Sequence, residues 1–144
     1  MTVACILKHK GADVAQVSPS DTIVSVSALL AARRIGAVLV TDTAGQLLGI
    51  VSERDIVRSL ARDGAATLGM TAAQLMTSTL VTVTPVTTVE EAMTLMSSNR
   101  VRHLPVLRDG ALAGLVSIGD IVKTRLEQQA HEVDSLRAYV SGGV

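Results

Sequence analysis

Two nine-residue stretches of the sequence resemble each other, Gly49-Ile50-Val51-Ser52-Glu53-Arg54-Asp55-Ile56-Val57 and Gly114-Leu115-Val116-Ser117-Ile118-Gly119-Asp120-Ile121-Val122. In each stretch, a short apolar run typical of a strand is followed by Ser-x-x-Asp and then by two apolar residues. Residues 17–57 align with residues 83–122 at an offset of 66, which falls to 65 after one deletion. A period of this length indicates the duplication of a supersecondary unit, because common solenoid repeats are shorter. Further matching pairs are Val17/Val83, Pro19/Pro85, Thr22/Thr88, Leu29/Leu95, Arg34/Arg100 and Gly45/Gly110.

Each copy is predicted to be a β-α-β-β-α unit. The patterning of the first copy predicts strands over 14–17, 37–41 and 47–52, a helix ending near Arg34, and a closing helix over 54–61. The second copy has predicted strands over 80–83, 103–107 and 112–117. Its first helix begins at a capping box formed by Thr87 and Glu90 and ends near Arg100. Its closing helix runs from Gly119 to about Tyr139.

The predicted fold class is α/β. Three strands and two helices cannot bury both faces of a sheet, but two such units packed about a pseudo-two-fold axis can do so. We therefore expect two small sheets, one composite core and a long C-terminal helix. The predicted boundaries are 8–63 for the first repeat, 64–125 for a linker (64–69), a short helix (71–76) and the second repeat, and 126–144 for a helical tail.

Composition argues against several classes of protein. The 144 residues carry 13 basic and 13 acidic side chains and a single aromatic residue, Tyr139. There is no basic excess to neutralise a phosphate backbone and there are no aromatic platforms for bases, so nucleic acid is not an expected partner. No apolar run reaches the roughly 18–20 residues that span a bilayer, so no membrane is expected. The single Cys5, and Lys8 following rather than preceding the apolar N-terminal run, lead us to expect a cytoplasmic protein.

No catalytic or metal-binding constellation is evident. Cys5 sits beside Ile6 and Leu7 and is interpreted as a small buried apolar residue. The three histidines have no ligand spacing with the cysteine, and no glycine-rich phosphate loop is present. We therefore predict a protein that is not an enzyme and needs no metal.

The repeated Ser-x-x-Asp has two interpretations. Ser52 with Asp55, and Ser117 with Asp120, have the spacing of a capping box at a helix N-terminus. The same carboxylates could instead accept hydrogen bonds from ribose hydroxyls, beside a helix N-terminus that favours phosphate. The two roles are compatible. Because the intervening residues differ while Ser and Asp recur, we favour the ligand.

A second candidate feature is the run Arg100-Val101-Arg102-His103-Leu104-Pro105. Two neighbouring side chains that can carry positive charge are unusual at the start of a buried strand. They could be edge residues that reach water, or they could face a ligand. The first copy has the smaller, uncharged Ile35-Gly36-Ala37 at this place. The two predicted clefts therefore cannot be equivalent.

The chain resembles cystathionine-β-synthase (CBS) domains. The resemblance is carried by Val101-Arg102-His103-Leu104-Pro105-Val106 and by the stretch 114–122, whose counterpart in the first copy is 49–57. The resemblance runs from about Lys8 to Arg125, and the tail is similar to that of stand-alone bacterial CBS-pair proteins. It implies a pair of repeats with two clefts that bind AMP, ATP, NAD(H) or S-adenosylmethionine.

The resemblance also implies the residues of each cleft. Site one would comprise Ser52, Arg54, Asp55, Val101, Arg102, His103, Thr77 and Ser78. Site two would comprise Ser117, Asp120, Ile35, Gly36, Ala37 and the segment 10–14, with Lys10, Ala12 and Val14. Leu39 stands where the family pattern, and Pro105 in the second copy, has proline. This departure bears on the strand geometry of site two.

The expected function is therefore that of a regulatory, non-catalytic module that senses energy or redox state through an adenosine nucleotide and acts on another protein. The resemblance and an apolar stripe in the tail imply a homodimer through the CBS pairs and the C-terminal helix. The stripe consists of Val122, Leu126, Val133, Leu136 and Val140, with Gln129 in its gap. The alternative is a structural dimerisation domain with empty clefts. An enzyme resembling inosine-monophosphate dehydrogenase is excluded, since a catalytic barrel needs about 250 residues.

Overall fold

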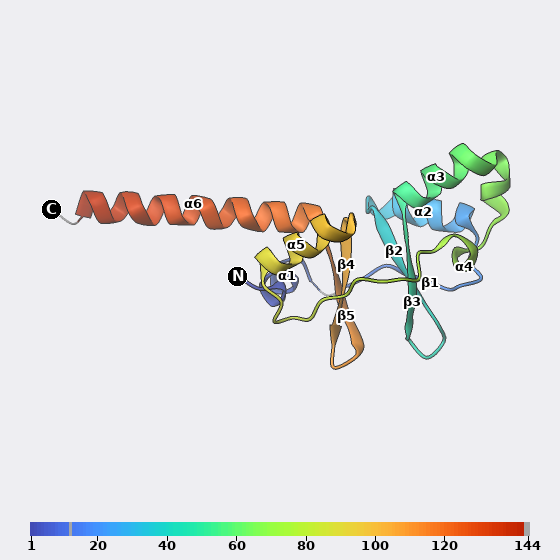
Figure 1. Cartoon of the computed structure of the whole chain (residues 1–144), viewed down its shortest axis with the longest axis horizontal. Coiled ribbons are helices and arrows are strands. Elements are labelled where there is room, and N and C mark those ends of the chain that lie inside the picture. Colours follow the sequence, from blue (N-terminus) through green and yellow to red (C-terminus); the bar gives the residue numbers. More distant parts are fainter. Residues whose placement is uncertain (12, 143–144) are drawn as a thin grey trace.

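The computed structural model describes residues 1–11 and 13–142 and contains the predicted duplication (Figure 1). The first half consists of α1 (Val3–Lys10), β1 (Gln16–Val17), α2 (Ile23–Arg33), β2 (Ala37–Thr41), β3 (Leu47–Ser52) and α3 (Glu53–Asp63). A 3₁₀ turn, η1 (Gly64–Gly69), and the short helix α4 (Ala72–Leu75) lead into the second half. This half consists of α5 (Val89–Asn99), β4 (His103–Arg108), β5 (Ala111–Ser117) and α6 (Ile118–Gly142). The predicted α/β class and tandem β-α-β-β-α repeats are confirmed.

Each repeat is built on an antiparallel hairpin with an irregularity in its register toward the turn, at Val40/Thr41 and at Val106/Leu107. In the first repeat, β2 pairs with β3, and β1 adds a short parallel strand to give the order β1-β2-β3. In the second repeat, β4 pairs with β5 alone. The strand predicted over 80–83 is reduced to Val83, which forms a parallel bridge with Val106. Val83 N donates to Pro105 O at 3.0 Å, so one rung of the expected ladder remains.

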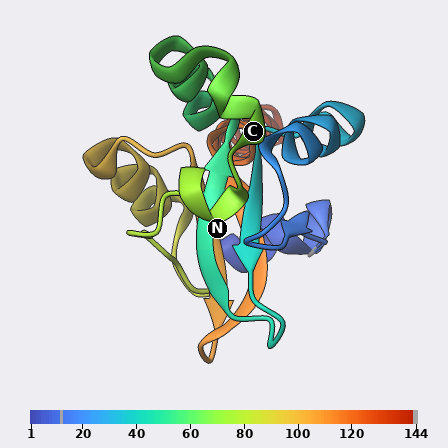
Figure 2. The same ribbon diagram turned by 90° about the vertical axis from the view of Figure 1, so that its right-hand side faces the viewer.

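The helix that precedes each repeat packs on the other repeat. Val3 N at the start of α1 donates to Thr87 O beside α5 at 2.8 Å, and Ala72 N at the start of α4 donates to Asp21 O beside α2 at 2.8 Å. No pattern in the sequence predicted α1, and the predicted first repeat began only at Lys8. In Figure 2 the hairpins of the two repeats stand one behind the other, with helices on both sides.

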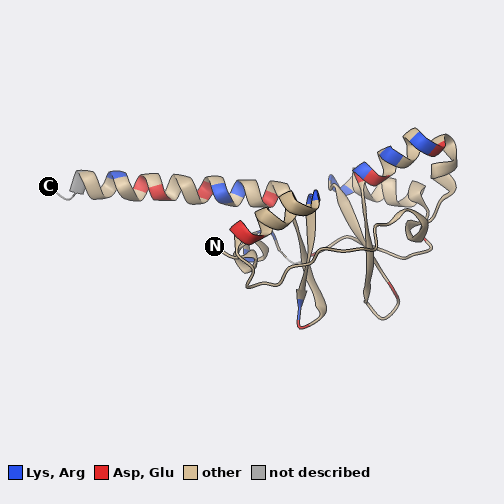
Figure 3. Cartoon of the chain, viewed as in Figure 1, with Lys and Arg blue, Asp and Glu red and all other residues tan. Residues whose placement is uncertain are grey.

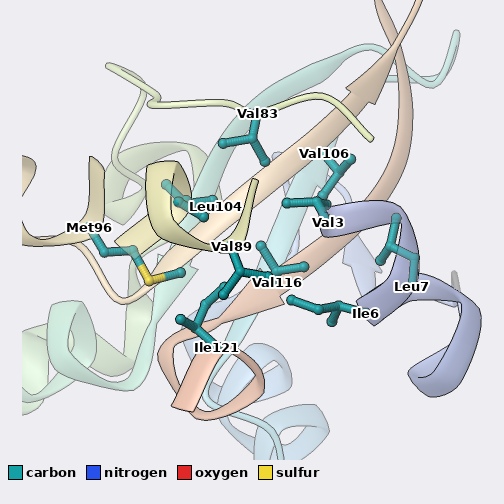
Figure 4. Packing of buried hydrophobic residues seen from close by; sticks show 11 residues of the cluster. Val3, Ile6, Leu7, Val83, Val89, Met96, Leu104, Val106, Val116 and Ile121 are labelled. Atoms are coloured by element: carbon teal, nitrogen blue, oxygen red, sulfur yellow. The ribbon is translucent and has the colours of Figure 1, made fainter. Parts of the chain in front are cut away.

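The expected single composite core is wrong, because the buried residues form two clusters. The second repeat's cluster includes three residues of α1, as Figure 4 shows: Val3, Ile6 and Leu7. The first repeat's cluster includes Ala72 of α4. The two halves are therefore joined by exchanged helices that complete each other's cores. The opposite face of β2, with Ala37 and Leu39, is also buried.

A glycine recurs in the second strand of each hairpin because an exchanged segment crosses there. A Cβ on Gly49 of β3 would lie 2.6 Å from Met76 Sδ and 2.9 Å from Thr77 O. A Cβ on Gly114 of β5 would lie 2.7 Å from Leu7 Cδ2. All three distances are shorter than real Cβ contacts. At Gly49 one of the close atoms belongs to the backbone, so this crossing requires glycine, whereas at Gly114 a Cβ would force the Leu7 side chain to move.

The helix ends are also repeated. Arg34 and Arg100 end α2 and α5 in the left-handed conformation, with φ of 54° and 53°. The capping box of α5 is formed by Thr88 and Glu91. The prediction of Thr87 and Glu90 was therefore wrong by one residue, because Thr87 instead bonds back to Thr84 in the preceding turn.

The C-terminal helix α6 continues without a break from the closing helix of the second repeat and projects from the body as a straight rod (Figure 1). The predicted boundary at residue 126 therefore falls inside one helix. Among the described residues, no helix is long and apolar enough to cross a membrane.

We predict that Gly114→Ala lowers the free energy of unfolding by about 1–3 kcal/mol, because the new methyl group collides with Leu7. Leu7→Ala alone should cost about 2–4 kcal/mol. The double variant should cost clearly less than the sum of the two, since each change makes room for the other. Chemical denaturation measures all three, and Gly69→Ala, with open space around it, is the control. Simple additivity would contradict the packing of α1 on β5.

Candidate functional site

A cleft of about 330 Å³ lies where the first repeat meets the second. Its walls come from the β3–α3 junction, the segment after α4 and the α5–β4 junction, so neither repeat could form it alone. The lining residues are Gly36, Ile50, Ser52, Glu53, Arg54, Asp55, Arg58, Thr77, Arg100, Val101, Arg102 and His103.

Ser52 and Asp55 form a reciprocal capping box at the N-terminus of α3. Asp55 N donates to Ser52 Oγ at 3.2 Å, while Ser52 N and Ser52 Oγ both donate to Asp55 Oδ2 at 2.9 Å. The capping interpretation is therefore correct. The capping box uses only one of the two carboxylate oxygens, since no residue in the described part of the chain donates to Asp55 Oδ1. The same arrangement that caps the helix holds an acceptor oxygen at the cleft.

Positive charge dominates the cleft. Arg54, Arg58, Arg100 and Arg102 line it against two carboxylates, Glu53 and Asp55. Arg54 and Arg58 are four residues apart and so lie on one face of α3. The first-turn amides of α3 add the partial positive charge of a helix N-terminus. The cleft can therefore attract an anion such as a phosphate.

His103 lies between the two halves and is largely uncharged at neutral pH. Burial lowers its pKa below the ordinary value, and the positive charge of Lys10 lowers it further. Asp120 and Glu53 oppose this effect in part, and Arg102 adds to it. Since the charge-bearing role expected of His103 requires protonation, the arginines are the source of positive charge at neutral pH.

Seven of the eight residues predicted for site one line this single cleft. They are Ser52, Arg54, Asp55, Thr77, Val101, Arg102 and His103. Ser78 is exposed beside Thr77 and does not line it. Gly36, which was predicted for site two, lines this cleft instead, and a Cβ placed on it would lie 3.4 Å from His103 Nε2.

In the predicted site two, Lys10 forms an ion pair with the carboxylate of Asp120. Lys10 Nζ donates to Asp120 Oδ2 at 2.7 Å and to Leu115 O at 2.9 Å. Ser117 N also donates to Asp120 Oδ2, at 2.8 Å, and Asp120 N donates to Ser117 Oγ. Burial alone would raise the pKa of Asp120, but the Lys10 and Ser117 hydrogen bonds lower it below its ordinary value. The second carboxylate is therefore already paired.

The other residues predicted for site two do not gather around one cavity. Ile35 packs against the core of the first repeat, Ala37 is buried, and Val14 is half-buried. Ala12 lies outside the described residues. Lys10 and Asp120 line a separate cavity of about 320 Å³ between α1 and α6, and none of the other described residues predicted for site two lines it.

Sequence reasoning missed four residues that line the first cleft: Ile50, Glu53, Arg58 and Arg100. Arg58 could have been found from its i, i+4 spacing to Arg54. Glu53 and Ile50 flank Ser52 within the repeated stretch. Arg100 was predicted as a helix end and begins the candidate run 100–105, but it was not assigned to either site, because a left-handed terminal residue gives no indication of where its side chain points.

The comparisons with known proteins agree with this architecture. The family model described as CBS domain matches residues 9–62 and 72–127. The mitochondrial CBS domain-containing protein CBSX3 of Arabidopsis thaliana is 35% identical over 150 residues, which cover 99% of this chain and 73% of that protein. The crystal structure of a CBS-domain containing protein from Agrobacterium tumefaciens is 42% identical with a TM-score of 0.85, covering 87% of this chain and 99% of that one.

A third similar protein was solved with a ligand. It is a CBS domain protein from Pyrobaculum aerophilum complexed with AMP, 28% identical with a TM-score of 0.74, and the match covers 83% of this chain and 89% of that one. Two repeats in one compact unit define a tandem β-α-β-β-α module. This chain belongs to the CBS domain family and carries two copies of the domain.

We predict that His103 makes stability depend on pH below about 6.5. Its pKa is lowered in the folded protein, so between the folded and unfolded values the unfolded chain binds more protons. The free energy of unfolding should therefore fall as the pH drops through about 6.5, and level off below the folded pKa. His103→Gln should flatten this part of the curve in urea unfolding, whereas His131→Gln on the exposed part of α6 should not. An unchanged curve in His103→Gln would contradict the burial of a neutral imidazole.

Proposed function

We propose that the cleft between the repeats binds an adenosine nucleotide and that the chain is a non-catalytic regulatory module. The observation that carries this proposal is the composition of the cleft, in which one carboxylate with an unused oxygen faces several arginines and a helix N-terminus. A nucleotide offers the complementary groups, namely a ribose diol and a phosphate. The AMP complex of the Pyrobaculum aerophilum protein supports the same ligand class.

Each part of the ligand has a proposed place. Asp55 Oδ1 accepts hydrogen bonds from the ribose hydroxyls while Oδ2 continues to cap α3. The phosphate lies near Arg102 and the N-terminus of α3. There it can accept charge-assisted hydrogen bonds, which are shorter and stronger than those between neutral groups. The base takes the apolar part of the cleft beside Ile50 and Val101.

The first cleft is proposed as the main site, and AMP or ATP is favoured over NAD(H). A volume of about 330 Å³ is near the lower end of ligand pockets, which suits a mononucleotide. At the second site, Lys10 Nζ lies 2.7 Å from Asp120 Oδ2 and offsets the charge of this carboxylate, so a ribose would share Asp120 with an ammonium group. Ser117, Ile35, Ala37 and Val14 keep their predicted role only if a ribose binds Asp120 beside Lys10.

As a regulatory module, the chain would report the level of its nucleotide to a partner protein whose activity it changes. The predicted homodimer through the CBS pairs and α6 is part of this proposal, and the cytoplasm is kept as the proposed compartment, although the Arabidopsis relative is mitochondrial. The competing hypothesis is a dimerisation domain with empty clefts. A thermal-shift series with AMP, ATP, NADH and S-adenosylmethionine separates the two, since ligand at 100 times Kd adds about 2.7 kcal/mol to stability.

We predict that Asp55→Ala weakens AMP binding at least tenfold, because an anchor for the ribose is lost. Asp120→Ala is the matched control, since it removes an equivalent capping carboxylate in the other repeat. Both variants should melt at lower temperature, but calorimetry should show a large loss of AMP affinity only in Asp55→Ala. Equal affinities in the two variants would leave Asp55 with a capping role alone.

We predict that Arg102→Ala weakens AMP by about 1.5–3 kcal/mol, through loss of a charge-assisted hydrogen bond, and weakens adenosine much less. Arg108→Ala, at the exposed far end of β4, serves as the control. Titrating AMP and adenosine into wild type and both variants measures the difference. If AMP and adenosine lose affinity equally, Arg102 does not contact the phosphate.

A further inference from the structure

The outer half of α6 makes no contact that shields it from solvent in the single chain. Every residue from 129 to 140 is exposed, and Leu136 and Val140 expose 63% and 65% of their surface. The helix spans 25 residues, or roughly 37 Å at 1.5 Å per residue. Isolated helices shorter than about 12–15 residues are marginal in water. The projecting segment gains no packing from its own chain, so a partner that covers its apolar residues would stabilise it.

The apolar residues of this segment follow a coiled-coil spacing. Leu126, Gln129, Val133, Leu136 and Val140 are separated by three, four, three and four residues, which is the a/d pattern of a heptad seam. This seam is not the face that packs on the body. Ile121 is buried in the core of the second repeat, and Arg125 bonds Glu90 of α5 at 3.0 Å. Contact with the body and pairing along the seam are thus compatible.

We propose that the seam of α6 pairs in parallel and in register with α6 of a second copy of this chain. The first argument is Gln129, the one polar side chain in the seam. In a parallel pair, Gln129 faces Gln129 of the partner subunit, and the two amides can hydrogen-bond to each other. An antiparallel pair that overlaps the seams sets Gln129 against Val133 of the partner subunit and leaves a buried amide unpaired, which costs free energy.

Charge gives the same orientation independently. Glu132 and Arg137 flank the seam at g and e positions, which meet across a parallel pair five residues apart. Glu132 then lies beside Arg137 of the partner subunit, and the symmetric contact repeats it. The antiparallel pair would instead place Glu132 beside Glu132 of the partner subunit and Lys123 beside Arg137 of the partner subunit. Figure 3 shows both signs of charge along α6, so the rod lacks the basic face that would favour a membrane surface.

The inference rests on the homodimer in the proposed function and is independent of nucleotide. Disulfide trapping tests it in the full-length chain with Cys5→Ser as background, since Cys5 is the only cysteine. Leu136→Cys should form an intersubunit disulfide in high yield, because equivalent d positions of a parallel pair are within disulfide reach. Ser135→Cys, one position off the seam, should form little.

The alternative arrangements give different results. A disulfide between Leu126→Cys and Leu136→Cys chains, without the Leu136→Cys self-disulfide, would mean antiparallel helices and would overturn the proposal. So would a dimer in sedimentation with no seam disulfide at all, which would leave the homodimer itself intact. A monomer at all concentrations would refute the homodimer and, with it, the helix pair.

Charge reversal gives a second readout. Glu132→Arg and Arg137→Glu should each weaken the dimer by about tenfold, because both symmetric pairs become repulsive. The double variant should restore wild-type affinity. Glu127→Arg makes the same charge change at an exposed position away from the seam and is the control. Failure of the double variant to recover, measured by sedimentation equilibrium at low salt, would overturn the parallel register.

Discussion

Each repeat completes its hydrophobic core with a helix that precedes the other repeat, α1 for the second repeat and α4 for the first. A hairpin with two helices has too little apolar surface to bury itself, and Val3, Ile6 and Leu7 supply what the second repeat lacks. Ala72 does the same for the first repeat. Because each repeat is completed by a segment that precedes the other, the halves are expected to fold together. The glycine crossings at Gly49 and Gly114 follow from the same constraint.

The exchange also explains why the cleft is composite. The segment after α4 must cross β3 to reach the second repeat, which brings Thr77 to the β3–α3 junction, where Ile50 and Thr77 pair. By the same pseudo-symmetry, the end of α1 brings Lys10 to the β5–α6 junction. A duplicated fold thus creates two equivalent positions. The side chains at these positions differ: among the described residues Asp55 has no cationic hydrogen-bond partner, whereas Asp120 forms an ion pair with Lys10.

The sequence predicted what repetition and periodicity encode. The hairpins, the closing helices and most of the first cleft followed from the repeated Ser-x-x-Asp and from Arg102 and His103 at the strand start. The helix α1 was missed because its capping residue, Thr2, makes no side-chain cap and its partner surface is distant in sequence. The pairing of Lys10 with Asp120 spans 110 residues, and no local pattern could predict it.

The two copies differ at positions that line the proposed nucleotide cleft and in the length of the closing helix, while their hairpins keep the same architecture. The second copy has Arg102 and His103 where the first has Gly36 and Ala37. Lys10 pairs with Asp120, whereas the carboxylate of Asp55 is bonded only by Ser52 within the described part of the chain. The closing helices have diverged as well, since α3 ends at Asp63 and α6 continues to Gly142. In the duplicated fold each repeat completes the core of the other, so the packing of both cores constrains their sequences. The cleft between the repeats and the end of α6 lie outside these cores, and their side chains can therefore differ between the copies. We propose a nucleotide site for the first and a helix pair for the second.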